Sequence, residues 1–173
     1  PVVQICELLK NSEVILADSV AQQLEAIRYE KCIAVLAHLA GPSVIAHPGG
    51  MHLSTGPISW LADNQQKGIS AVPAVTIHGS AGFSESHWHI DRKESGRLLV
   101  EAAGHYLGTK VSQFQVHGWR YAKPIQVTPD RCLIAHRQPP LVVAGDACGG
   151  PRVEGAALSG WASARVLSEL LHG

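Results

Sequence analysis

The chain has 173 residues, of which 46% are apolar and 16% are charged, so it can fill a hydrophobic core and is not disordered in character. Its 14 basic and 14 acidic residues give zero formal net charge, which provides no electrostatic footprint for a nucleic acid or an anionic membrane. No apolar run is long enough to span a bilayer. Four cysteines without C-x-x-C spacing favour a reduced, cytoplasmic protein.

The first half of the chain predicts two helices followed by strands. Apolar residues at helical spacing and a capping residue near position 18 indicate the helices. A continuous apolar run then suits a central strand covered on both faces, and alternating residues indicate later strands. Helices are expected over residues 2–10 and 18–26, and strands over 29–39, 58–62 and 74–79.

The second half predicts one helix, three strands and a terminal helix. Asp91 followed by Glu94 resembles a capping box, and Gly108 is a typical helix stop. The long strand that follows is expected to end at Lys123-Pro124, because proline breaks a strand. Strands are expected over 111–121, 131–135 and 141–144, and the last helix from about 152 to 171.

This order of elements favours an α+β fold with a largely antiparallel sheet flanked by helices. The chain shows no internal repeat and no low-complexity segment. A boundary is expected near Pro124 to Pro129, which gives two domains over residues 1–127 and 128–173.

The segment from Pro140 to Ala156 carries the strongest functional signal. A short apolar strand ends at Gly145-Asp146, a glycine-rich turn follows, and a helix begins near Arg152. Such a helix N-terminus presents backbone N–H groups to an anion, and the aspartate can accept hydrogen bonds from hydroxyls. The pattern is typical of a nucleotide site, although a plain strand-turn-helix unit would also use these glycines.

The strand over 111–121 gives a second signal. His117, Trp119 and Tyr121 fall on one side of it, where three rings would make a good wall for a flat polar ligand. The alternative is a half-exposed sheet face covered by a helix, and a shift of one residue in register would exchange the two faces.

A third signal lies between Trp60 and Lys67. Trp60, Asp63, Asn64 and Lys67 place an indole, a carboxylate, an amide and an ammonium within eight residues. The alternative is a solvated turn, for which these residue types are common.

Other catalytic motifs are missing from the sequence. The ten histidines show no zinc-like spacing with a cysteine or an acidic residue, so no metal site is expected. Neither G-x-S-x-G nor a Walker A motif occurs, which leaves hydrolase and kinase functions without support.

The stretch LVVAGDACGGPRVEGAALSGWASARVL resembles the C-terminal flavin-binding segment of the FAD-dependent amine-oxidase-like superfamily, and within it the renalase-like family. The blocks ISWLADNQQKGIS, VTIHGSAGFSESHW and VHGWRYAKP are similar to that family's substrate domain. The G-x-G-x-x-G motif that opens such enzymes does not occur in this sequence. The resemblance therefore implies a substrate-binding domain over 1–127, followed by the returning tail of a Rossmann-like FAD domain.

The resemblance also implies a function. The complete enzyme would transfer hydride from a small substrate, an amine or a reduced nicotinamide dinucleotide isomer, to FAD and then to O₂; the chain alone would be inactive. No residue is assigned as a catalytic acid or base, because the cofactor carries the chemistry. Substrate contacts are implied for Trp60, Asp63, Asn64, Lys67, His117, Trp119 and Tyr121, and FAD contacts for Gly145, Asp146, Arg152, Val153, Glu154, Gly155 and Ala156.

Two other functions stay open at this point. The chain could be a non-catalytic α+β module that binds a nucleotide or a protein, or it could belong to another flavoprotein of the superfamily, such as a desaturase. The apolar strand over 141–144 is expected to lack neighbours normally supplied by the missing FAD-binding half. Self-association through this tail, or docking of the tail onto the substrate domain, is the expected consequence.

Overall fold

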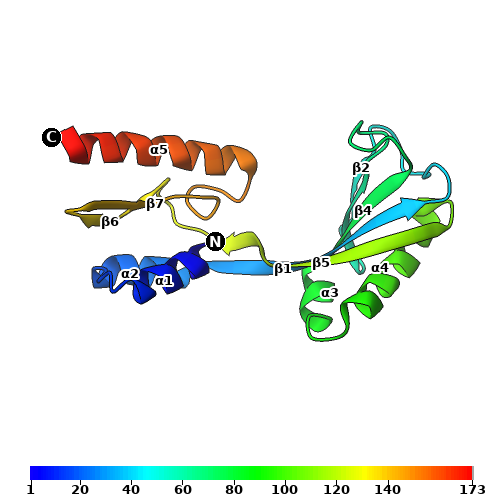
Figure 1. Ribbon diagram of the computed structural model, residues 1–173, viewed down its shortest axis with the longest axis horizontal. Helices are drawn as coiled ribbons and strands as arrows, with labels where there is room; N and C mark the ends of the chain where they lie inside the picture. The colour runs from blue at the N-terminus through cyan, green and yellow to red at the C-terminus, as the bar shows by residue number, and fades with distance from the viewer. Residues whose placement is uncertain (173) are drawn as a thin grey trace. The chain divides into compact units, whose positions relative to one another are not determined.

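The computed structural model describes residues 1–172, which form two units (Figure 1). Unit 1 comprises Pro1–Glu30 together with the segment from Lys123 onward, and unit 2 comprises Lys31–Ala122. The chain passes between the units within two long strands, β1 (Arg28–Leu39) and β5 (Val111–Gln126).

Unit 2 is built on a five-stranded antiparallel sheet with the order β2-β3-β4-β1-β5. Its other strands are β2 (Gly50–His52), β3 (Ile58–Asp63) and β4 (Ala74–Gly79). The register aligns three ring side chains across neighbouring strands, because His52 is opposite Trp60 and Trp60 is opposite His78. The sheet therefore gathers residues from separate parts of the sequence onto one face.

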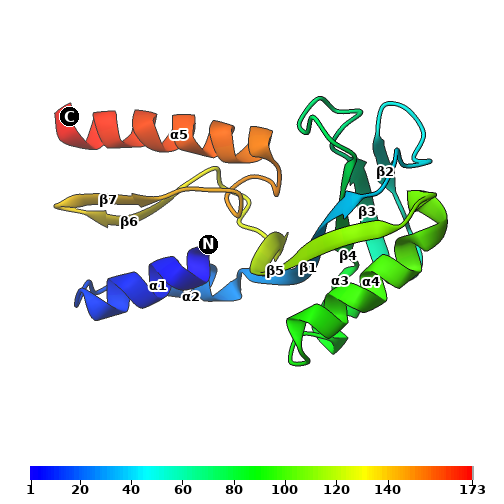
Figure 2. The ribbon, with the colours of Figure 1, turned by 45° about the vertical axis from the view of Figure 1, so that its right-hand side comes forward.

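Two helices, α3 (Ala81–Ser86) and α4 (Arg92–Leu107), pack on the other face of this sheet (Figure 2). The buried core between them includes Ile33, Ile77 and Leu99, none of which exposes surface to solvent. Alternation along each strand sends every second side chain into this core, and burial of that apolar surface is the main stabilising contribution.

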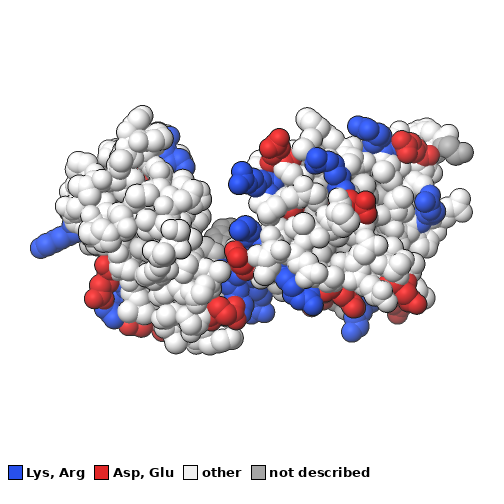
Figure 3. Space-filling view, turned by 180° about the vertical axis from the view of Figure 1, so that it is seen from behind, with Lys and Arg blue, Asp and Glu red and all other residues white. Residues whose placement is uncertain are grey.

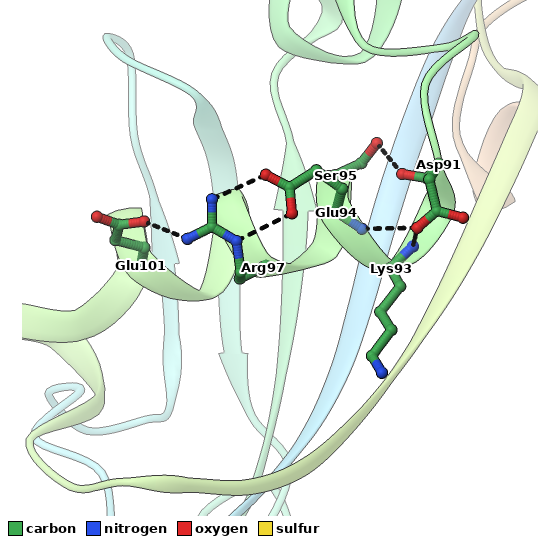
Figure 4. A network of polar contacts seen from close by, with 6 residues as sticks. All are labelled: Asp91, Lys93, Glu94, Ser95, Arg97 and Glu101. Carbon is green, nitrogen blue, oxygen red and sulfur yellow. Dashed lines mark hydrogen bonds and ion pairs between the residues drawn. The ribbon is translucent and has the colours of Figure 1, made fainter.

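Both ends of α4 are capped. The Oδ1 of Asp91 accepts hydrogen bonds from the backbone N–H groups of Lys93 at 2.9 Å and Glu94 at 3.0 Å (Figure 4). At the other end Gly108 adopts a left-handed conformation with φ of 66°. The start and stop predicted from the sequence are thus confirmed.

Unit 1 is a layered arrangement around a two-stranded antiparallel sheet of β6 (Leu133–Arg137) and β7 (Pro140–Val143). Figures 1 and 2 show α5 (Val153–His172) on one side of this sheet and α1 (Val2–Asn11) with α2 (Asp18–Ala26) on the other. Apolar side chains from these elements share one core, whose buried members are Val2, Leu24, Ile27, Leu133, Ala135, Val143 and Ala147.

The predicted α+β class with an antiparallel sheet flanked by helices is confirmed, but three details differ. The short strand β2 was not predicted. β5 continues through Pro124 to Gln126, because β5 is an edge strand and an edge position does not need the N–H that proline lacks. Residues 1–30 group with the C-terminal segment rather than with residues 31–127, because α1 and α2 pack onto the core of the β6–β7 sheet.

Candidate functional site

The face of the unit 2 sheet opposite α3 and α4 carries a set of ring side chains. Phe114 and Val116 of β5 pack against the core under α4, so the alternate residues His117 and Trp119 lie on the opposite face. Neither helix of unit 2 packs on that face, and Trp119 is 54% exposed. We call this set the ring face; its members are His52, Trp60, His78, His117 and Trp119.

The rings form two closely packed pairs. The ring centroids of His52 and Trp60 are 4.4 Å apart, and those of His117 and Trp119 are 4.3 Å apart in an edge-to-face arrangement. Trp60 lies over the backbone of Gly50 in β2, where a Cβ in place of the glycine hydrogen would approach its ring to 2.7 Å. Glycine at position 50 therefore allows this indole to lie flat against the sheet.

The central histidine of the ring face is a neutral group at pH 7. Burial lowers the pKa of His78, because a partly desolvated imidazole binds a proton less readily. Its neighbour in β4, Thr76, lies on the same face and accepts a hydrogen bond of 3.0 Å from the Nδ2 of Asn64. The ring face is therefore aromatic and hydrogen-bonding in character.

Positive charge lies at the edge of this face. The Nζ of Lys67 is 6.0 Å from the centroid of the Trp60 ring, within the range of a cation–π contact. Four residues between positions 60 and 67 were predicted to lie together. Of these, Trp60 belongs to the ring face, Lys67 lies beside its ring, and Asn64 is hydrogen-bonded to Thr76 on the same face.

Asp63, the fourth of these residues, is in a different environment. It is only 4% exposed, and its carboxylate accepts hydrogen bonds from Ser43 Oγ at 2.6 Å and from the backbone N–H groups of Gln65 and Gln66 at 2.9 Å each. Burial alone raises the pKa of this carboxyl, but the hydrogen bonds from Ser43 and Gln66 outweigh burial and lower it. In this structure Asp63 holds the turn together and does not line the ring face.

A second group of predicted residues lies in unit 1, in the turn over 145–152 and the start of α5. Gly145, Gly149 and Gly150 have φ values of 143°, 90° and 137°, a conformation that favours glycine. The backbone N–H of Gly145 donates to Ser159 Oγ at 2.9 Å, and the Ser159 hydroxyl donates in turn to the carbonyl of Arg131. Ser159 thus fixes the turn against α5.

The turn and the helix are in direct backbone contact at Gly155. A Cβ at this position would overlap the carbonyl oxygen of Gly150, and it would lie only 2.9 Å from the carbonyl carbon. Around this contact is a small pocket of about 260 Å³ lined by Arg131, the glycine turn and the first turn of α5. Glycine at 155 thus brings the turn close to the helix N-terminus.

Several polar groups at this place have no partner within residues 1–172. Among the described residues no acceptor lies within hydrogen-bond distance of the backbone N–H groups of Val153, Glu154 and Gly155, whereas the next N–H, from Ala156, donates to the carbonyl of Arg152 at 2.9 Å. The half-buried carboxylate of Asp146 also accepts no hydrogen bond from the part of the chain that the structure describes. These groups are the donors and the acceptor that a ligand with phosphate, carbonyl and hydroxyl groups would require.

The remaining predicted residues line the edges of the two sites. Tyr121 follows Trp119 in the alternation of β5 and is half-buried, while the side chains of Arg152, Val153 and Glu154 are exposed at the start of α5. Sequence reasoning missed His52 and His78 as members of the ring face. The signal for His78 was present, because it alternates with the buried residues Val75 and Ile77 of β4.

In the view of Figure 3 basic and acidic side chains are interspersed where they occur, and a broad area at the left of the view carries few of them. Within residues 1–172 no three His, Cys, Asp or Glu side chains are arranged to hold a metal ion. The described helices also include none with the length and apolar character needed to cross a membrane. Comparison with known proteins finds no family model and no curated protein that matches the chain.

Proposed function

We propose that the chain is the substrate-binding and C-terminal portion of a renalase-like, FAD-dependent oxidoreductase. The proposal rests on the sequence resemblance and on one structural observation, the glycine turn that meets the start of α5. Residues 128–173 would contribute to the cofactor site, and the ring face would contact a small substrate.

The glycine turn fits a flavin dinucleotide in its chemistry. The N–H groups of Val153, Glu154 and Gly155, which have no acceptor within residues 1–172, suit an oxygen atom that gains negative charge. The carboxylate of Asp146, which accepts no hydrogen bond from the same residues, suits a hydroxyl donor. Gly155 leaves no room for a side chain beside Gly150, so the turn is held close to the helix N-terminus where these N–H groups lie. When bound, FAD would supply the centre that accepts hydride.

The ring face suits a planar and largely uncharged substrate. Indole and imidazole rings stack on flat molecules and exclude water from them, which favours hydride transfer over side reactions. Trp60 and Trp119 would provide the stacking surfaces, and neutral His78 would offer one hydrogen bond. An amine and a reduced nicotinamide dinucleotide isomer are both consistent with such a surface.

The test is the flavin absorbance of purified protein. We expect the chain expressed with its upstream coding sequence to retain bound flavin and the 173-residue chain alone to retain none. In the longer protein Gly155→Ala should reduce flavin content, while Gly160→Ala, in the same helix but with open space around it, should not. Absence of flavin from both forms would refute the proposal.

The alternative function, a protein-binding module, is supported by a different observation. β6 and β7 pair only with each other within the described chain, and α5 exposes Val153, Trp161 and Leu171. An open strand edge and exposed apolar side chains are typical of surfaces that another chain covers. A concentration-dependent dimer in light scattering, without flavin in the longer protein, would favour this function.

A further inference from the structure

A groove separate from both sites lies between α4 and the edge strand β5, on the helix-covered side of the unit 2 sheet. Its volume is about 590 Å³, which is within the usual size of ligand pockets. Four of its eight lining residues are apolar, two are basic, and the other two are Ser112 and Gln113. The residues that matter here are Arg92, Lys93, Val100, Val111, Phe114 and Val116.

Arg92 has a buried donor without an acceptor. Its guanidinium lies 4.3 Å from the centroid of the Trp88 ring, and it is also against the backbone of Gly118. Within residues 1–172 its Nη1 is buried and makes no hydrogen bond, and Arg92 forms no ion pair. Burying a charged donor in this way is unfavourable unless an acceptor is supplied from elsewhere.

The acidic residues nearby are already occupied. The Asp91 carboxylate caps the backbone of α4, and Glu94 pairs with Arg97 at 2.8 Å (Figure 4). Lys93 takes part in no ion pair among the described residues. The groove therefore combines uncompensated positive charge with an apolar lining.

We propose that this groove binds a carboxylate that carries a hydrocarbon chain. The planar fork of a guanidinium matches the two oxygens of a carboxylate, and the lysine adds attraction at the mouth of the groove. The chain lies against Val100, Val111, Phe114 and Val116, where its burial provides affinity. This site is independent of the ring face, because the two are on opposite sides of the same sheet.

The experiment is calorimetric titration of the 173-residue chain with decanoate, decanol and inorganic phosphate. We expect decanoate to bind about tenfold or more tightly than decanol, since one charged hydrogen bond accounts for such a factor. Phosphate should bind too weakly to detect, because it cannot use the apolar lining. Equal binding of decanoate and decanol, binding of phosphate alone, or no binding of decanoate would each overturn the proposal.

Four variants locate the binding. Arg92→Gln should weaken decanoate binding about tenfold or more, and Lys93→Gln, an exposed position, about threefold. Arg97→Gln removes an arginine from the same helix outside the groove and should leave binding unchanged. If Arg92→Gln fails to fold, Lys93→Gln and Val111→Asp test the assignment instead. An unchanged affinity for decanoate in both of these variants, or a loss of affinity in Arg97→Gln equal to that in Arg92→Gln, would refute the assignment.

Discussion

Gly155→Ala is expected to destabilise unit 1, although alanine is the better helix former. Replacing glycine within a helix gains up to about 1 kcal/mol in propensity. At position 155, however, the new Cβ overlaps the carbonyl oxygen of Gly150 and lies 3.2 Å from its Cα, so backbone must move. Overpacking of this kind costs about 1–3 kcal/mol, and the upper part of the range applies because a backbone atom yields less than a side chain.

Gly160→Ala is the matched control, because it lies in the same helix and its Cβ would meet nothing within 4 Å. The propensity gain is shared, so the difference in unfolding free energy between the variants isolates the overlap, about 1–3 kcal/mol. Urea unfolding followed by circular dichroism and tryptophan fluorescence measures this difference. A midpoint for Gly155→Ala equal to or above that of Gly160→Ala would refute the close contact between turn and helix.

Three further predictions concern unit 2, each measured by urea unfolding. Asp91→Ala should cost about 1 kcal/mol because α4 loses its cap, whereas Glu101→Ala, which removes an exposed ion pair, should cost less than about 0.5 kcal/mol. Burial raises the pKa of the Asp63 carboxyl, but the hydrogen bonds that it accepts, first that from Ser43, outweigh burial and lower the pKa below 3.8. The ionised carboxylate therefore stabilises the folded protein fully above pH 3.8, and this contribution is lost on acidification. Asp63→Asn should cost about 1–3 kcal/mol at pH 7 and flatten this acid dependence; an unchanged profile would contradict it. Burial lowers the pKa of His78 below 6.5, so the free energy of unfolding should fall as the pH decreases through 6.5. The fall should be smaller in His78→Gln, and an equal dependence of the unfolding free energy on pH in the variant and the parent would argue against a desolvated ring.

Local patterns in the sequence were sufficient for most elements. Alternation predicted β4, and the capping residue with a terminal glycine predicted the bounds of α4. β2 was missed because a three-residue strand has no periodicity of its own and exists through pairing with β3. The packing of α1 and α2 onto the β6–β7 sheet was missed for a related reason, since it joins segments at opposite ends of the sequence.

The candidate site divides in the same way. The face of His117 and Trp119 followed from alternation along one strand, and the structure has them on a face free of unit 2 helices. The alignment of His52 and His78 with Trp60 depends on the register of three strands. No single segment of the sequence determines this register. Residue type alone could not predict the role of Asp63, because a carboxylate is suited both to a ligand site and to a tight turn.

The composition of the ring face bears on what must cover it. Leu36 is 47% exposed and Trp119 54% exposed, so this side of the sheet presents apolar and aromatic surface to water. Solvent-facing positions of an antiparallel sheet are ordinarily polar, so exposed rings at these positions are unusual. Desolvation of His78 further disfavours the charged imidazole. A bound planar ligand and a covering protein surface would both remove this exposed area, and the Trp60 ring that lies flat over Gly50 is part of the surface either one would cover.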